Sequence, residues 1–319
     1  MTAVYAKYND SRKPEYRLVT TVEEGGGLFS LKRAATDAAA GFLDSLFEKH
    51  RLLVAAGFPL EPLEPGAHAG GVRFDYLEGG SLDGRAFAAV RAGDAGSLRE
   101  VFREYGELVG RVPMAAGDAG GGFEEFLGDG FSGATAGMGL LAVGCLDLIL
   151  ENIYEDGGGF RLIDYEWTFS FPLPRDLVLA RTVMNTYYKY RAYGINRLLP
   201  AAELFGLLGV DGTGTEGLMR LEWGFQRAVN KQVQPFDGFR DLYEKVLFEP
   251  YEGGAPLAEL RAAFDEQAGR LARAEEELGH ARRMLADRDA EIGSMRASKF
   301  WKMRELYLSV RGLPSRLRR

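Results

Sequence analysis

Three polar residues near the middle of the chain have the types and spacing that phosphoryl transfer requires. Asp147 is followed five positions later by Asn152, and Asp164 comes after an intervening glycine-rich turn. One carboxylate can orient an acceptor hydroxyl, while an amide and a second carboxylate can hold Mg²⁺ against nucleotide phosphates. The pattern predicts Asp147 as the catalytic residue and Asn152 and Asp164 as metal ligands.

Each of these residues also has an ordinary structural interpretation. Asp147 or Asn152 alone would cap a helix or a turn. Glu166 and Asp176 are equally compatible with a structural role and are not assigned to the site. The three histidines are too scattered for a metal cluster, and Cys145 is better read as a packed apolar residue than as a nucleophile.

The elements that must position these residues begin with a small sheet. Residues 4–8, 16–22 and 28–32 alternate in polarity, which predicts antiparallel strands. Residues 36–54 have apolar side chains at helical spacing, and residues 72–77 form another apolar run that ends at two glycines. A small sheet with one helix is therefore expected in the first quarter of the chain.

The remainder is mostly helical in pattern. Ser97 and Glu100 form a capping box ahead of an apolar stripe that Pro113 ends. Two short runs at 152–154 and 160–163 predict a hairpin around three glycines, and residues 176–248 again have helical periodicity. A second, helical lobe is expected to follow the sheet.

The loop 147–152 and the strand end Ile163-Asp-Tyr-Glu166 resemble those of the protein-kinase-like superfamily. They are most similar to the branch of aminoglycoside phosphotransferases and choline kinases, and the likeness covers about residues 1–245. It implies an α+β, bilobal kinase-like fold with a small antiparallel-sheet N-lobe (1–80) and a mainly helical C-lobe (81–250). ATP and Mg²⁺ are the cofactors that the resemblance implies.

The same resemblance assigns a nucleotide site. Such folds have a lysine on the third strand of the N-lobe paired with a glutamate on the following helix, and Lys32 and Glu48 occupy these places. Backbone groups at Asp75 and Leu77 would meet an adenine at the hinge between the lobes. Lys32, Glu48, Asp75 and Leu77 are thus the expected cofactor-binding residues.

The segment that would cover the phosphates departs from the family pattern. Residues 9–15 contain no glycine and offer Arg12 and Lys13 instead. Basic side chains could take over the contacts that backbone N–H groups make elsewhere. A kinase-shaped protein without catalytic activity is the alternative.

A narrower resemblance extends to both ends of the chain. Residues 8–16, residues 163–172 and a heptad region ending in Ser298-Lys-Phe-Trp301 are similar to kinase-like modules of bacterial surface-polysaccharide proteins, including O-antigen chain-terminating kinase/methyltransferases. The acceptor implied is a hydroxyl of a small molecule or a cell-surface glycan. No methyltransferase or glycosyltransferase domain is evident in the sequence.

Residues 257–297 have an unbroken seven-residue apolar repeat, which predicts a coiled coil. One heptad position holds Leu257, Phe264, Leu271, Leu278, Leu285 and Ile292. This segment would join the protein to a second copy or to a partner protein. A single helix lying on the domain is the alternative, because Gln267 and Arg288 interrupt the other heptad position.

The last segment, 298–319, combines basic charge with aromatic residues. Residues 299–319 carry seven basic side chains against Glu305, so the rest of the chain is strongly acidic within a net charge of −7. An amphipathic helix on an anionic membrane surface is favoured over a tail that binds protein or nucleic acid. No recognised nucleic-acid fold is present, so no nucleic-acid partner is expected.

Composition places the chain among globular proteins. It has 319 residues, of which 46% are hydrophobic and 27% charged, values that exclude general disorder. Cys145 is the single cysteine, and the longest apolar run, 138–150, falls short of the roughly 20 residues of a membrane span. We expect a cytoplasmic protein that attaches peripherally to the inner face of the membrane through its tail. It is either a phosphotransferase or a kinase-shaped scaffold.

Overall fold

The computed structural model describes residues 2–24, 26–116, 121–210 and 214–251. The chain divides into two units, Met1–Gly253 and Gly254–Arg319, and the description below concerns the first. The predicted coiled coil at 257–297 and the predicted basic tail at 298–319 lie outside the described residues. None of the described helices is both long and apolar enough to span a lipid bilayer.

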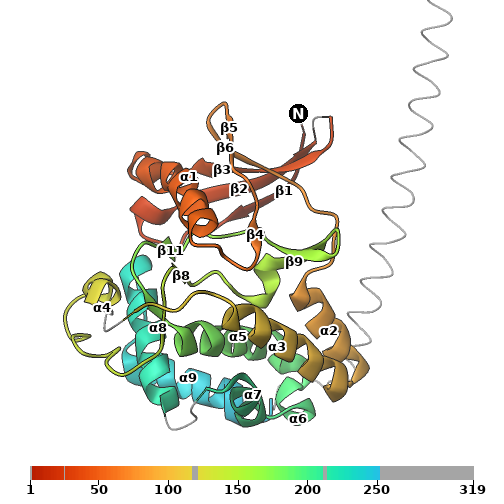
Figure 1. Ribbon diagram of the computed structural model, residues 1–319, viewed down its shortest axis with the longest axis vertical. Coiled ribbons are helices and arrows are strands. Elements are labelled where there is room, and N and C mark those ends of the chain that lie inside the picture. The colour runs from red at the N-terminus through yellow and green to blue at the C-terminus, as the bar shows by residue number, and fades with distance from the viewer. Residues whose placement is uncertain (1, 25, 117–120, 211–213, 252–319) are drawn as a thin grey trace, which may run out of the picture. The chain divides into compact units, whose positions relative to one another are not determined.

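The N-terminal part is an antiparallel sheet with one helix against it (Figure 1). Across the sheet the strands run β1 (Thr2–Tyr8), β2 (Leu18–Glu24), β3 (Leu28–Ala34), β6 (Gly71–Asp75) and β5 (Gly66–His68). Helix α1 (Ala40–Ala55) packs on β3 and β6 through Leu43, Leu46 and Leu53. The register pairs Lys32 of β3 with Thr20 on one side and Val72 on the other. This pairing fixes Lys32 near the centre of the sheet.

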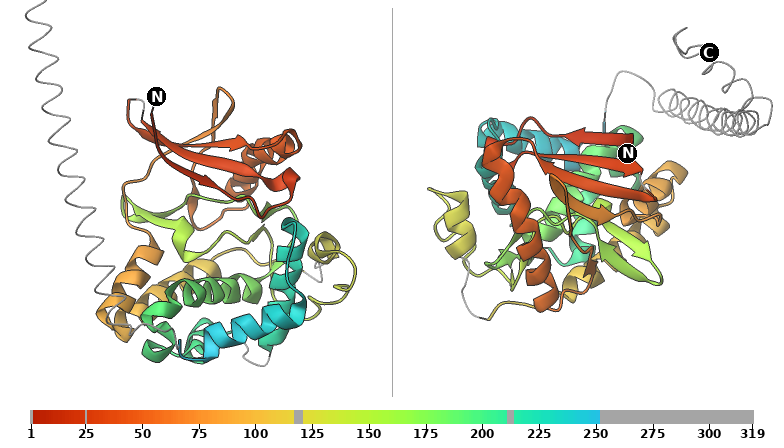
Figure 2. Two further views of the ribbon diagram at one scale, coloured as in Figure 1. Left: turned by 180° about the vertical axis from the view of Figure 1, so that it is seen from behind. Right: turned by 90° about the horizontal axis from the view of Figure 1, so that it is seen from above.

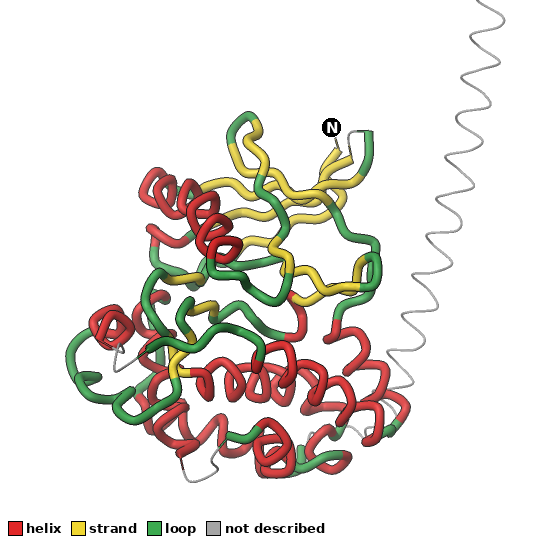
Figure 3. The backbone as a smooth tube through the Cα atoms, in the orientation of Figure 1, coloured by secondary structure: helices red, strands yellow, loops and turns green. Residues whose placement is uncertain are grey.

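The larger C-terminal part is mostly helical, as the tube in Figure 3 shows. Its helices are α2 (Leu82–Ala92), α3 (Ala95–Gly110), α4 (Gly121–Leu127), α5 (Arg175–Tyr190), α6 (Ile195–Leu198), α7 (Ala201–Leu208), α8 (Thr215–Val229) and α9 (Phe236–Phe248). Helix α5 contacts α2, α3, α7, α8 and α9, so it forms the centre of this part. The views from behind and from above in Figure 2 show the sheet on one side of this helical layer.

Short strands between α4 and α5 carry the predicted catalytic segment. They are β7 (Leu140–Leu141), β8 (Gly144–Cys145), β9 (Ile153–Asp156), β10 (Gly159–Leu162), β11 (Thr168–Phe169) and β12 (Leu173–Pro174). β9 and β10 form a hairpin to which β4 (Glu61–Pro62) adds, while β8 pairs with β11 and β7 with β12. Residues 147–152 lie between β8 and β9, and Asp164 is the second residue after β10.

The sheet, the 153–162 hairpin and the helical remainder confirm the mixed architecture expected from the sequence. The predicted capping box is wrong: α3 begins two residues before Ser97, because the Asp94 side chain accepts a hydrogen bond from Ser97 N at 3.0 Å and so caps the helix. Strand β2 begins at Leu18 because Pro14–Tyr16 forms a 3₁₀ turn.

Candidate active site

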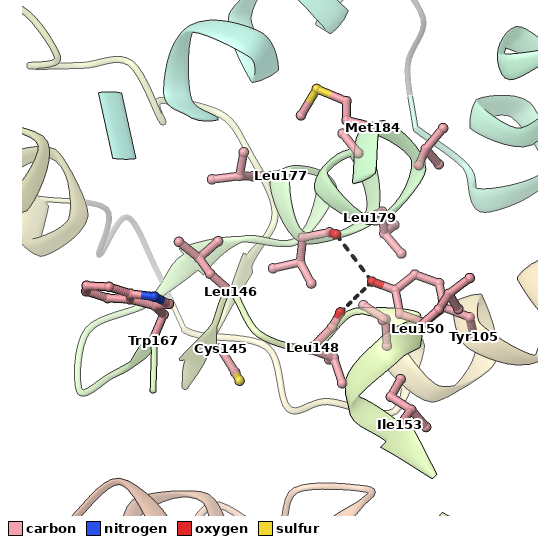
Figure 4. Packing of buried hydrophobic residues seen from close by; sticks show 14 of the residues in the cluster. Tyr105, Cys145, Leu146, Leu148, Leu150, Ile153, Trp167, Leu177, Leu179 and Met184 are labelled. Atoms are coloured by element: carbon pink, nitrogen blue, oxygen red, sulfur yellow. Dashed lines mark hydrogen bonds between the residues drawn. The ribbon is translucent and has the colours of Figure 1, made fainter. Parts of the chain in front are cut away.

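The segment from Asp147 to Asn152 is held by side chains of the helical core (Figure 4). The Tyr105 hydroxyl of α3 donates to Leu148 O at 2.8 Å and lies 3.2 Å from Val178 O. Arg181 Nε of α5 donates to Leu146 O at 3.0 Å. Since buried carbonyls are costly to leave unpaired, these contacts fix the backbone on both sides of Asp147.

The amide of Asn152 is oriented by the same segment. Asn152 Nδ2 donates to Asp147 O at 2.9 Å, and Ile163 N donates to Asn152 O at 3.0 Å. The Nδ2 group of Asn152 is therefore used in a hydrogen bond within the loop. This arrangement leaves Oδ1 as the atom that Asn152 can offer to the cavity it lines.

Asp147 itself is a buried carboxylate on the same loop as Asn152. The residue is 8% exposed and does not belong to the cavity lining, and its Oδ2 accepts a hydrogen bond from Trp167 N at 2.6 Å. Burial, together with the nearby charges of Asp164 and Glu166, raises the pKa of the Asp147 carboxyl to about 7. Asn152 and Asp164 line the cavity, whereas Asp147 does not.

Four charged side chains meet at one end of the cavity. Lys32 Nζ of β3 lies 3.0 Å from Asp164 Oδ1 and also pairs with Glu166 Oε1. Arg12 NH1, from the loop between β1 and β2, lies 2.5 Å from Glu166 Oε2. The two oxygens of Glu166 therefore hold one cation each. Lys32 and Glu166 are only 5% and 4% exposed, whereas the Asp164 side chain is 32% exposed.

The charged groups in this cluster shift one another's pKa values. Burial disfavours the charged form of Glu166, but Lys32 and Arg12 outweigh burial and lower its pKa to about 2. Burial likewise opposes the charge of Lys32, yet Asp164 and Glu166 raise the Lys32 pKa above its usual value. For Asp164, burial and the neighbouring Glu166 raise the pKa despite Lys32.

The expected pairing of Lys32 with Glu48 does not form. Glu48 is exposed on α1, while the ion pairs of Lys32 go to Asp164 and Glu166. The next residue, Lys49, points inward instead. Its Nζ donates to the backbone O of Glu166 and lies 4.0 Å from the centre of the Phe42 ring. Glu166, which the sequence left unassigned, therefore takes the place expected for Glu48.

The sequence of α1 itself indicates that Lys49, and not Glu48, faces the interior. Lys49 falls three residues after Leu46 and four before Leu53, so it lies on the buried stripe of α1. Glu48 lies on the neighbouring, exposed side. The pairing of Lys32 with Glu166 can be found only from the three-dimensional structure, because the two residues are 134 positions apart in the chain.

The cavity has a volume of about 650 Å³ and lies between the sheet and the hairpin β9–β10. Its polar end holds Arg12, Lys32, Asn152, Asp164 and Glu166. The remainder includes apolar side chains from the sheet, the linker and the hairpin, namely Leu18, Val22, Leu28, Leu63, Phe74, Leu77 and Ile163. Asp75 and Leu77, the predicted hinge residues, both belong to this lining.

The glycine-free loop is fastened to the helical part. Lys13 N donates to Val229 O at 2.9 Å, and Lys231 N donates to Ser11 O at 2.9 Å. The Lys13 side chain also reaches Ala228 O at 2.6 Å. These bonds tie residues 11–13 to the end of α8, and they hold Arg12 over the cavity.

A divalent cation would find two oxygen ligands here. Lys32 occupies Oδ1 of Asp164, so Oδ2 of Asp164 and Oδ1 of Asn152 are the atoms available on the cavity wall. Among the described residues no group of three or more histidine, cysteine, aspartate or glutamate side chains has a metal-site arrangement. Such a pair suits Mg²⁺, which is commonly bound by one or two protein oxygens together with waters and substrate phosphates.

Cys145 has the packed, unreactive environment expected for it. It is buried in β8, and burial together with Asp147 raises the pKa of its thiol to about 12.

Comparison with known proteins finds similarity to solved structures only. No protein-family model and no curated protein matches the sequence. A Plasmodium vivax ethanolamine kinase is 14% identical over 70% of this chain and 73% of its own, with a TM-score of 0.30. A macrolide 2'-phosphotransferase from Brachybacterium faecium is 12% identical over 78% and 93%, with a TM-score of 0.32. A choline/ethanolamine kinase family protein from Mesorhizobium loti is 16% identical over 70% and 82%, with a TM-score of 0.29.

Proposed function

We propose that this protein is an ATP- and Mg²⁺-dependent phosphotransferase that acts on a hydroxyl group. One observation carries the proposal: two cations, Lys32 and Arg12, and two side chains with oxygen atoms, Asn152 and Asp164, line one cavity of about 650 Å³. Cations and oxygen ligands at one end of a largely apolar pocket suit a molecule with a phosphate end and a flat apolar end.

In this proposal each part of the cavity has a role. The adenine lies in the apolar part, where backbone groups near Asp75 and Leu77 meet its polar edge. Lys32 and Arg12 bind the phosphates. Asn152 and Asp164 hold Mg²⁺, which neutralises phosphate charge when bound.

The transfer step assigns a task to Asp147. The acceptor oxygen forms a bond to the γ-phosphorus while the bond from this phosphorus to the bridging oxygen of ADP breaks. The hydroxyl proton passes to the Asp147 carboxylate and from there to water. Because Trp167 N holds Oδ2 of Asp147, Oδ1 is the oxygen that orients the acceptor.

The sequence resemblance extends the proposal to the acceptor and to the partners. We assign the acceptor to the glycans of bacterial surface-polysaccharide synthesis. Residues 257–297 would join a second copy or a partner protein, and residues 299–319 would contact an anionic membrane surface.

A scaffold without catalytic activity is the second candidate function. It is favoured by the pairing of both cations with Glu166 and by the bonds from Lys13 and Lys231 that fasten the loop. A protein of this kind would organise polysaccharide-synthesis enzymes without binding nucleotide.

Titration calorimetry with ATP, with and without Mg²⁺, separates the two functions. We expect ATP to bind the wild-type chain more tightly with Mg²⁺ than without it. The difference should disappear in Asp164→Asn and persist in Asp44→Asn, which makes the same chemical change at an exposed position on α1. Absence of ATP binding at millimolar concentration would instead favour the scaffold.

A further inference from the structure

One wall of the cavity is a face of the sheet, where β1, β2 and β3 lie side by side (Figure 1). Residues that pair across neighbouring antiparallel strands place their side chains next to one another on the same face. Two rows of paired residues line the cavity in this way. The first row is Tyr5, Val22, Ser30 and Phe74, and the second is Lys7, Thr20 and Lys32.

The two rows differ in chemistry. The first is largely apolar and ends at Phe74, the neighbour of Asp75, so it borders the proposed adenine site. The second has only polar side chains and ends at Lys32, which the proposed function assigns to the phosphates. Strands lie about 4.8 Å apart, so the backbone of Lys7, two strands from Lys32, is separated from it by roughly 10 Å. The flexible stem of Lys7 can carry its ammonium group toward a phosphate chain that Lys32 holds.

Within the described part of the chain, Lys7 is the one cation of the cavity wall that has no carboxylate partner. The other two cations, Arg12 and Lys32, both pair with Glu166. The Lys7 side chain is exposed and forms no ion pair with a described residue. It can therefore bind an anion without first giving up a carboxylate.

The backbone of the glycine-free loop has little to offer a phosphate. Ser11 N donates to Asn9 Oδ1 at 3.1 Å, and Lys13 N donates to Val229 O at 2.9 Å. Pro14 has no N–H group. Because backbone N–H groups that are already bonded cannot cradle an anion, side-chain donors have to supply these contacts here.

We propose that Lys7 binds the phosphate chain of the nucleotide and makes the site selective for nucleotides over nucleosides. The inference rests on the proposed phosphotransferase function, which it deepens by naming a further specificity-determining residue. Thr20, between the two lysines, has a hydroxyl that forms no hydrogen bond with the described residues. Lys7, Thr20 and Lys32 thus present a line of hydrogen-bond donors along the phosphates.

Titration calorimetry of the full chain with ATP and with adenosine, both in the presence of Mg²⁺, tests this inference. We expect Lys7→Met to raise the Kd for ATP about fivefold or more, because one charge-assisted hydrogen bond is lost. The Kd for adenosine should not change. Lys7→Arg keeps the charge and should bind ATP nearly as tightly as the wild type. Lys245→Met, at an exposed position on α9, is the control and should change neither Kd.

Acetylation of lysines, read by mass spectrometry, gives a test without substitution. Because Lys7 is exposed, acetic anhydride should label it in the chain without ligand. Saturating ATP should largely prevent this labelling, whereas adenosine should not. Labelling of Lys245 should be the same in all three samples.

The inference and the proposed function can fail separately. A rise of less than about fivefold in the Kd for ATP, or an equal rise for adenosine, would overturn the role of Lys7 alone. Equal labelling of Lys7 with and without ATP would do the same, and Lys7 would then be a solvated lysine that protects the edge strand β1 from pairing with another chain. A wild-type chain that binds no ATP would overturn both proposals.

Discussion

Arg12 and Glu166, which are 154 positions apart in the sequence, form an ion pair of 2.5 Å over the polar end of the cavity. Glu166 also holds Lys32. One carboxylate thus joins the loop between β1 and β2, the third strand of the sheet and the segment that follows the hairpin. This residue organises the cation pair that the proposed phosphate site requires.

Removing Arg12 should weaken nucleotide binding. Arg12→Met keeps much of the stem but loses the guanidinium, so we expect the Kd for ATP with Mg²⁺ to rise about tenfold to a hundredfold, because one charge-assisted hydrogen bond contributes roughly 1.5–3 kcal/mol. Titration calorimetry measures this change. Arg51→Met, which removes a guanidinium from an exposed position on α1 outside the cavity, is the control. An unchanged Kd in Arg12→Met would show that Arg12 acts only in holding the loop.

Removing the charge of Glu166 should cost stability. In Glu166→Gln the buried Lys32 and the largely buried Arg12 lose a shared anion, which we expect to lower the free energy of unfolding by about 3 kcal/mol. Urea denaturation of this variant and of Asp44→Asn gives the comparison. A loss as small as that in Asp44→Asn would mean that Asp164 and water compensate both cations.

Lys49 should make the stability depend on pH. Burial lowers its pKa from the usual 10.5 to about 8, despite the nearby carboxylates. Between pH 8 and 10.5 the unfolded chain binds more protons at this residue, so the stability contributed by Lys49 rises with pH across that window. Below pH 8 its buried charge is unfavourable throughout.

The comparison of Lys49→Met with the wild-type chain isolates this contribution. Urea midpoints measured from pH 7 to pH 10 should show the largest advantage of Lys49→Met at pH 7 and a shrinking advantage as pH rises. Lys245→Met, at an exposed position on α9, should keep a constant difference from wild type. A constant difference for Lys49→Met as well would mean that Lys49 titrates normally.

The hydrogen bonds between residues 11–13 and the end of α8 should protect the amides involved from hydrogen exchange. The amides of Lys13 and Lys231 donate to carbonyls across the two parts of the molecule, so both are expected to exchange slowly and together. Mass spectrometry of peptides covering residues 9–16 and 226–233 measures this protection. Rapid exchange of Lys13 with slow exchange of the α8 amides would show that the loop opens freely.

Local sequence patterns predicted much of the fold but little of the charge network. Alternation predicted the strands, and the glycine turn predicted the hairpin, because each depends on neighbouring residues. The start of α3 was misassigned because Asp94 and Ser97 both suit a cap, and only the backbone shows which one bonds. Helix α4, within a glycine-rich stretch, had no periodic signal.

The part of the candidate site that lies within one loop could be predicted from the sequence. Asp147 and Asn152 share one loop, and Asn152 hydrogen-bonds to the backbone of Asp147 as their spacing allows. The pairing of Lys32 with Glu166, and of Glu166 with Arg12, joins three distant segments and depends on how the sheet lies over the hairpin. No pattern of neighbouring residues contains that information.

The most direct measurement is the calorimetric titration of ATP with Mg²⁺ into the wild-type chain and into Asp164→Asn. A site in which Asp164 and Asn152 hold the cation beneath bound phosphates predicts one ATP per chain in the wild type and loss of the Mg²⁺-dependent gain in the variant. Equal binding of ATP by both proteins, or by neither, would contradict it.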